Sequence, residues 1–193
     1  PCLVAVFILS KPIVYILFQR GAFSSVDTFR TAPALLTLAL GIPAYVINKI
    51  IVSNFFANEK TKAPFKISLV CLIVNVTGNL ILIRYLGYVG ITITTALTGW
   101  LNSFLLIMYS YNQNIFKFDY VIKIKFMKMC LSCVFLFLFL QSAVKLLENY
   151  IYNESKLISV SSFSGMVLCA VLVYIFALSA TKTYSLAEIK KLL

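Results

Sequence analysis

The sequence contains no histidine and few acidic residues, and these shortages exclude most enzyme chemistry. Its 193 residues include six aspartates and glutamates, and none of the six lies within a long apolar run. A histidine-based triad or metal site lacks its central side chain, and a proton relay inside the apolar runs lacks its carboxylates. No GxGxxG or P-loop pattern for nucleotides is present. We therefore expect a protein that is not an enzyme.

Charge of either sign is scarce, which argues against a soluble domain. Charged residues make up 12% of the chain and hydrophobic residues 61%, whereas soluble domains have about 25% charged residues. Four apolar stretches run close to 20 residues or longer, and a fifth is nearly that long. Because about 20 residues of helix cross the ~30 Å hydrocarbon core of a bilayer, we predict an all-α, polytopic integral membrane bundle.

The net charge of +11 does not indicate a nucleic-acid partner, because the basic residues lie in short loops between apolar runs and form no surface stripe. Their distribution indicates orientation instead. If the spans alternate, ten lysines fall on the side that includes the C-terminus and six basic residues on the other. The positive-inside rule then places the C-terminus in the cytoplasm.

The five cysteines all lie in or beside apolar runs, where thiols behave as small hydrophobic groups. Cys130 and Cys133 have the spacing of a metal or redox motif, but the chain has no second CxxC. Since a zinc site needs about four ligands, we expect no metal site here.

The first apolar run, Cys2 to Phe18, is interrupted by Lys11-Pro12. It is either one helix with a lysine near its middle or a helix that ends near Ser10, followed by an interfacial segment from Pro12. We favour the second interpretation, because proline suits the first turn of a helix. The run begins at residue 1 without a methionine, so we expect a fragment whose first span is truncated.

The remaining spans give about six transmembrane segments in total. Ser25 or Asp27 is expected to cap the second span, and Pro43 to kink it. A tight turn at residues 86–90 joins the third and fourth spans, and residues 112–128 form a basic loop. The later spans are expected at Thr31–Asn58, Phe65–Tyr85, Ile91–Tyr111, Met129–Leu147 and Leu157–Ala180.

The chain is thus expected to consist of a helical lobe, residues 1–180, and a cytoplasmic tail, residues 181–193. In the tail, Ser185-x-x-Glu188 fits a capping box and predicts a short interfacial helix.

Lys49 is the only charged residue deep within a clear span. One interpretation makes it a cation that lines a polar pathway for an anionic substrate. The other makes it a lysine whose ammonium group reaches the cytoplasmic interface, because Glu59 follows ten residues later. The sequence leaves both open.

Small and polar residues recur every three or four positions in the third and fourth spans, which the short turn makes antiparallel neighbours. Ordinary helix packing across such stripes is one explanation, with Asn102 as an interhelix polar contact. The alternative is that Asn75, Asn79 and Thr95 offer oxygen ligands to a cation such as Na⁺.

Several motifs resemble, in the right order, those of the MurJ/MviN family of lipid II flippases. The resemblance covers about residues 1–118, and only hydropathy agrees beyond them. It rests on Pro12-Ile13-Val14, Leu17-Phe18-Gln19-Arg20-Gly21-Ala22-Phe23, Asp27-Thr28, Ala39–Ala44, Lys49, Phe55-Phe56-Ala57, Lys60–Ile67, Asn79-Leu80, Gly87–Gly90 and Trp100-Leu101-Asn102.

The resemblance implies the second lobe of a fourteen-helix transporter of the multidrug/oligosaccharidyl-lipid/polysaccharide exporter superfamily, from the end of helix nine to helix fourteen. It implies that the protein moves lipid II, the undecaprenyl-pyrophosphate-linked peptidoglycan precursor, across the bacterial inner membrane by alternating access. The implied partners are lipid II, membrane lipids and a missing N-terminal lobe with the family's essential arginines.

The resemblance also places a sodium site at Asn75, Asn79, Ile91 and Thr95, and it matches Lys49 to a lysine common in the family. Position 79 is acidic in that pattern, so the asparagine removes a charge. Na⁺ coupling is therefore an open expectation. Alternative functions are a related O-antigen-type flippase, a cation-coupled drug antiporter and an inactive truncated membrane subunit.

Overall fold

The computed structural model describes residues 1–19, 21–113, 120–152 and 156–181, and every regular element within these ranges is a helix. The chain divides into two compact units, Arg30–Lys117 and the remainder (Pro1–Phe29 with Phe118–Leu193). The predicted tail helix lies outside the described residues. The helices are α1 (Cys2–Phe18), α2 (Ser25–Ala39), α3 (Ile42–Ala57), α4 (Lys62–Leu86), α5 (Tyr88–Asn112), α6 (Tyr120–Leu146), α7 (Glu148–Ile151) and α8 (Lys156–Ala180).

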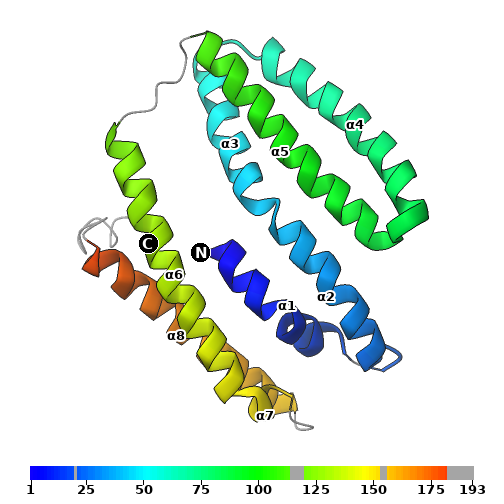
Figure 1. Ribbon diagram of the computed structural model, residues 1–193, viewed down its shortest axis with the longest axis vertical. Helices are drawn as coiled ribbons and strands as arrows, with labels where there is room; N and C mark the ends of the chain where they lie inside the picture. Colours follow the sequence, from blue (N-terminus) through cyan, green and yellow to red (C-terminus); the bar gives the residue numbers. More distant parts are fainter. Residues whose placement is uncertain (20, 114–119, 153–155, 182–193) are drawn as a thin grey trace. The chain divides into compact units, whose positions relative to one another are not determined.

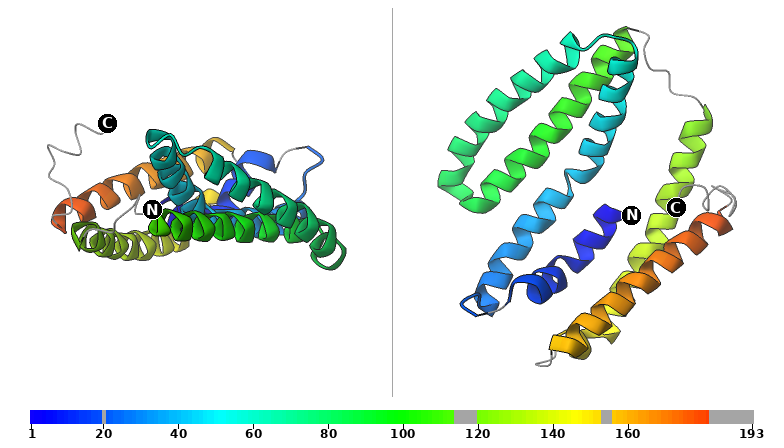
Figure 2. Two further views of the ribbon diagram at one scale, coloured as in Figure 1. Left: turned by 90° about the horizontal axis from the view of Figure 1, so that it is seen from above. Right: turned by 180° about the vertical axis from the view of Figure 1, so that it is seen from behind.

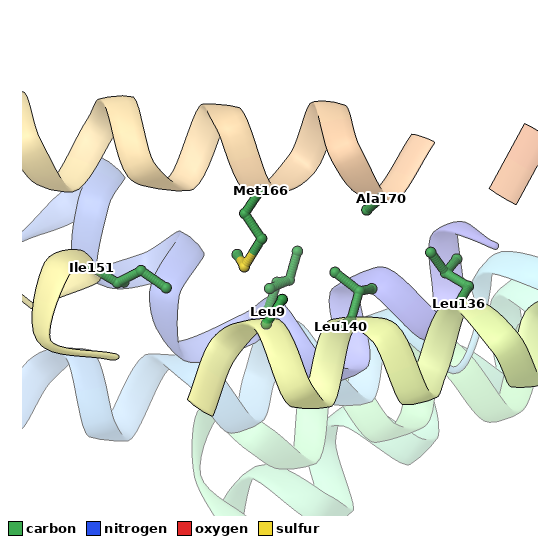
Figure 3. Packing of buried hydrophobic residues seen from close by; sticks show 7 residues of the cluster. Leu9, Leu136, Leu140, Ile151, Met166 and Ala170 are labelled. Carbon is green, nitrogen blue, oxygen red and sulfur yellow. The ribbon is translucent and has the colours of Figure 1, made fainter. Parts of the chain in front are cut away.

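In the unit that contains both ends of the chain, α1, α6 and α8 pack together. They share a cluster of buried hydrophobic residues, and Figure 3 shows Leu9 lying between residues of α6 and α8. The buried members are Leu9, Leu136, Leu140, Ala143, Ile151, Met166 and Ala170. Such a core fixes the packing of these helices without any buried charge.

Helix α1 corrects one prediction from the sequence. It continues through Lys11-Pro12 to Phe18 instead of ending near Ser10, and Pro12 is buried within it. The Lys11 side chain is exposed, and its ammonium group lies 5.2 Å from the centroid of the Phe29 ring. This cation–π contact stabilises the charge beside the continuous helix.

The other unit is built on α5, which lies between α3 and α4 (Figure 1). Helices α4 and α5 run antiparallel, as the right view of Figure 2 shows, and one residue, Gly87, joins them with φ 58°. That left-handed conformation favours glycine. The predicted turn was too long, because α5 already begins at Tyr88.

The kink predicted near Pro43 in the second span is a short break between two helices. Helix α2 ends at Ala39 and α3 starts at Ile42, with Pro43 in its first turn. The span also begins earlier than predicted, at Ser25. Ser24, rather than Ser25, caps it: its backbone N–H donates to Asp27 Oδ2 at 2.9 Å, and the Asp27 N–H donates to Ser24 Oγ at 3.3 Å.

Helix α6 starts at Tyr120, so the second half of the predicted basic loop is helical. Lysines are compatible with a helix that extends beyond the apolar span, because their long side chains let the ammonium groups reach water. Within the described residues, five helical spans are long and apolar enough to cross a membrane, and α1 is a shorter apolar helix. Many large apolar side chains remain exposed, such as Phe65 at 70% and Phe176 at 74%, as expected for surfaces that face lipid.

Candidate functional site

A chain of hydrogen bonds links α4 to α5 halfway along their length. The Asn79 side-chain amide donates to Asn75 Oδ1 at 3.0 Å, and the Asn75 amide donates to Thr98 Oγ1 at 3.0 Å. The Thr98 hydroxyl in turn donates to the Thr94 carbonyl in its own helix. We call Asn75, Asn79 and Thr98 the amide chain. It confirms that the polar stripes of the two spans face each other.

Small residues allow this close approach of α4 and α5. A Cβ atom added to Gly78 would lie 2.5 Å from Thr94 Cγ2, and one added to Gly90 would lie 2.5 Å from the Leu82 carbonyl oxygen. Neither position has room for a side chain. The glycines therefore set the distance at which the asparagines and Thr98 can bond, as small residues do between membrane helices.

On its other side, α5 holds the interrupted span. Pro43 has no N–H, and the break leaves carbonyl groups without helical donors. The Trp100 indole N–H donates to the Leu40 carbonyl at this break at 3.0 Å, and the Ser103 hydroxyl donates to the Ala44 carbonyl within α3 at 2.9 Å. The Tyr45 hydroxyl returns a bond to the Thr95 carbonyl at 3.1 Å. These hydrogen bonds between α5 and the interrupted span stabilise that span.

Three amide oxygens in this unit are buried, and no donor among the described residues reaches them. They are the Oδ1 atoms of Asn48, Asn79 and Asn102. Asn48 does use its amide nitrogen, which donates to the Gly99 carbonyl at 3.3 Å. Unpaired oxygens are costly in an apolar interior, so these three atoms mark where water or another polar group is most favoured. The predicted interhelix contact of Asn102 stays a prediction.

The four residues implied as a sodium site are only partly brought together. Asn75 and Asn79 bond to each other, and the Thr95 hydroxyl donates to the Ile91 carbonyl at 2.8 Å within α5. Asn79 Oδ1 is the one unpartnered side-chain oxygen among them in the described part of the chain. A hard cation is bound by several oxygens at once. As arranged here, the four residues do not fit one.

Lys49 is exposed on α3. It directly follows Asn48, whose side chain faces α5, so the ~100° turn per residue directs Lys49 away from that contact. No described residue forms a hydrogen bond or ion pair with it. The structure therefore separates Lys49 from the amide chain, and its predicted role stays a prediction.

A second polar cluster, in the unit that contains both chain ends, was missed by reasoning from the sequence. A cavity of about 200 Å³ is lined by Lys11, Tyr15, Gln19, Ser25, Thr28, Phe29 and Tyr152. The Tyr15 and Tyr152 rings meet edge to face with centroids 4.9 Å apart. Burial raises the pKa of Tyr152, and the nearby Glu148 carboxylate raises this pKa further. No pattern in the sequence indicates that residues so far apart along the chain lie close together.

These observations define the class of the protein: a multi-pass helical membrane protein whose polar groups lie between helices. Residues 1–161 match the family model described as "Lipid II flippase MurJ". The chain belongs to the MurJ family. Two curated relatives, each described as "Probable lipid II flippase MurJ", are 34% identical over 174 residues (Rickettsia prowazekii) and 37% identical over 106 residues (Rhizobium meliloti).

The first relative is matched over 90% of this chain and 34% of its own length, and the second over 55% and 20%. The chain thus spans about a third of the length of such relatives. A solved structure titled "Lipid II flippase MurJ, inward closed conformation" has the same fold, with a TM-score of 0.71 at 24% identity, over 92% of this chain and 34% of that one.

Proposed function

We propose that the whole protein, of which this chain is a C-terminal lobe, moves lipid II across the bacterial inner membrane. The observation that carries the proposal is the family match over residues 1–161, which includes every residue of the candidate site. The reaction is a transfer between two sides of a membrane, and no covalent bond is made or broken.

The structure supports alternating access as the mechanism. The second span is interrupted at Leu40-Gly41, and Trp100 of α5 donates to the Leu40 carbonyl there. Discontinuous helices are common in transporters, where they form the binding sites around which one part rocks against another. We further propose that the C-terminus and the Asn58–Thr61 loop face the cytoplasm, because the lysines are concentrated on that side.

Complementation tests the function. Expression of the whole protein in bacteria depleted of their own lipid II flippase is expected to restore growth and cell shape. A protein that reaches the membrane in normal amounts and restores neither would refute the proposal. Labelling of single cysteines at residues 60 and 145, introduced into a variant without native cysteines, tests the orientation: residue 60 should react only from the cytoplasmic side.

We propose that Na⁺ has little effect on this protein, because the amide chain already satisfies most of the polar groups that a cation would need. Asn79→Asp replaces an amide donor with a carboxylate beside Asn75. We expect this variant to gain a melting temperature that rises with NaCl but not with choline chloride. The matched control is Asn58→Asp, at the exposed end of α3. Strong Na⁺ stabilisation of the unmodified protein would contradict the proposal.

We propose that Lys49 lines the route of the anionic head group in the whole protein. Lys49→Ala is then expected to lower transport by about ten-fold or more, the scale of a lost hydrogen bond to a charged group, and Lys49→Arg to retain most of it. Lys145→Ala, another exposed lysine, is the control. Undiminished transport by Lys49→Ala would show that the lysine only extends to the interface.

A further inference from the structure

An open groove lies where α3 ends and α4 begins. Helices α3 and α4 both pack on α5, and the space between them near the Asn58–Thr61 loop has a volume of about 770 Å³. This volume is in the range of small-molecule sites. The lining residues are Val52, Phe56, Thr61, Lys62, Pro64, Phe65, Lys66, Ser68 and Leu69.

The groove combines a wide apolar wall with positive charge at one end. Phe56 and Phe65 are 59% and 70% exposed, so the aromatic rings are available to a ligand. Lys62 and Lys66 lie one turn apart on α4 and are therefore neighbours on its surface. No carboxylate is present among the described residues that line the groove. A ligand that fits must have a hydrocarbon part and an anionic head.

The start of α4 adds to the positive field. Its N-cap residue, Thr61, makes no side-chain cap hydrogen bond, and its first turn has no acidic residue. The backbone N–H groups there carry the partial positive charge of the helix dipole. This field acts in the same direction as that of the two lysines. This field favours an anionic phospholipid head group over a zwitterionic one, because the cation of a zwitterionic head group would lie near the lysines.

We propose that the groove binds one anionic phospholipid of the surrounding bilayer. The phosphate lies between Lys62 and Lys66, and an acyl chain lies along Val52, Phe56 and Leu69. Basic pockets between membrane helices on the cytoplasmic side are suited to anionic lipid heads, and the lysine count favours that side for this loop. The lipid is a resident of the membrane rather than the transported substrate.

Native mass spectrometry of the purified, delipidated whole protein tests the proposal. We expect selective retention of added dioleoylphosphatidylglycerol over dioleoylphosphatidylcholine. The double variant Lys62→Gln/Lys66→Gln should lose about ten-fold or more of this affinity, since each basic residue near an anionic surface contributes about five-fold. The control Arg30→Gln/Arg84→Gln removes the same charge at exposed positions at the opposite end of the same unit and should bind as before.

Two further measurements distinguish the possible results. Lys62→Arg/Lys66→Arg keeps both charges and should keep the lipid, which distinguishes lost charge from lost folding. Inorganic phosphate should fail to displace the phospholipid, because it lacks the acyl chain. Equal retention of the two lipids, equal loss in the control, or displacement by phosphate would each overturn the proposal. Lipid binding is measured without transport, so it can fail while the proposed transport function stands.

Discussion

Replacing Gly90 by alanine is expected to force α5 away from α4 and to destabilise the whole protein by about 3 kcal/mol, the upper part of the range for overpacking. The added methyl carbon would lie 2.5 Å from the Leu82 carbonyl oxygen and 2.7 Å from the Leu82 carbonyl carbon. Both are backbone atoms and cannot rotate away. Thermal unfolding in detergent measures the loss, and complementation should fail at elevated temperature.

Gly165→Ala is the matched control for Gly90→Ala. Gly165 also lies within a long helix, α8, but a Cβ atom there meets nothing within 4 Å. Alanine has a higher helix propensity than glycine, so this variant should be as stable as the parent or slightly more stable. Equal stability of the two alanine variants would contradict the packing of α4 against α5 described here.

Replacing Asn75 by leucine is expected to break the amide chain at its centre. The change removes the acceptor of the Asn79 amide and the donor to Thr98 at once. Asn79, whose Oδ1 is already unpartnered among the described residues, would then lose its one described side-chain bond. Interhelix bonds in membranes contribute about 0.6 kcal/mol on average and up to ~1.7. With a buried amide left unpaired, we expect a loss of about 2 kcal/mol.

Thr77→Val is the control for Asn75→Leu on the same helix. Its hydroxyl is exposed and, among the described residues, bonds to the Ile73 carbonyl of its own helix, so its loss should change stability by less than about 0.5 kcal/mol, as is usual for surface substitutions. A double-mutant cycle of Asn75→Leu with Thr98→Val should show coupling. Simple additivity of the two changes would mean that the bond between Asn75 and Thr98 does not form in the bilayer.

The sequence alone determined the membrane class and the five long spans, because both follow from the length of apolar runs measured against the bilayer. It also determined the kink near Pro43, since a missing N–H acts within one turn of its own helix. The helical period and the short connection at Gly87 also predicted that the polar stripes containing Asn75 and Thr98 face each other.

Tertiary structure decided the rest, because the decisive partners are far apart in sequence. The sequence favoured a helix that ends near Ser10 over the continuous α1, because the position of Lys11 beside Phe29 was visible only in three dimensions. Trp100 reaches the Leu40 carbonyl across 60 residues. Apolar periodicity shows which face of a helix is buried but not which helix it meets. The central position of α5, the partners of each asparagine and the groove beside Lys62 therefore required the packed fold.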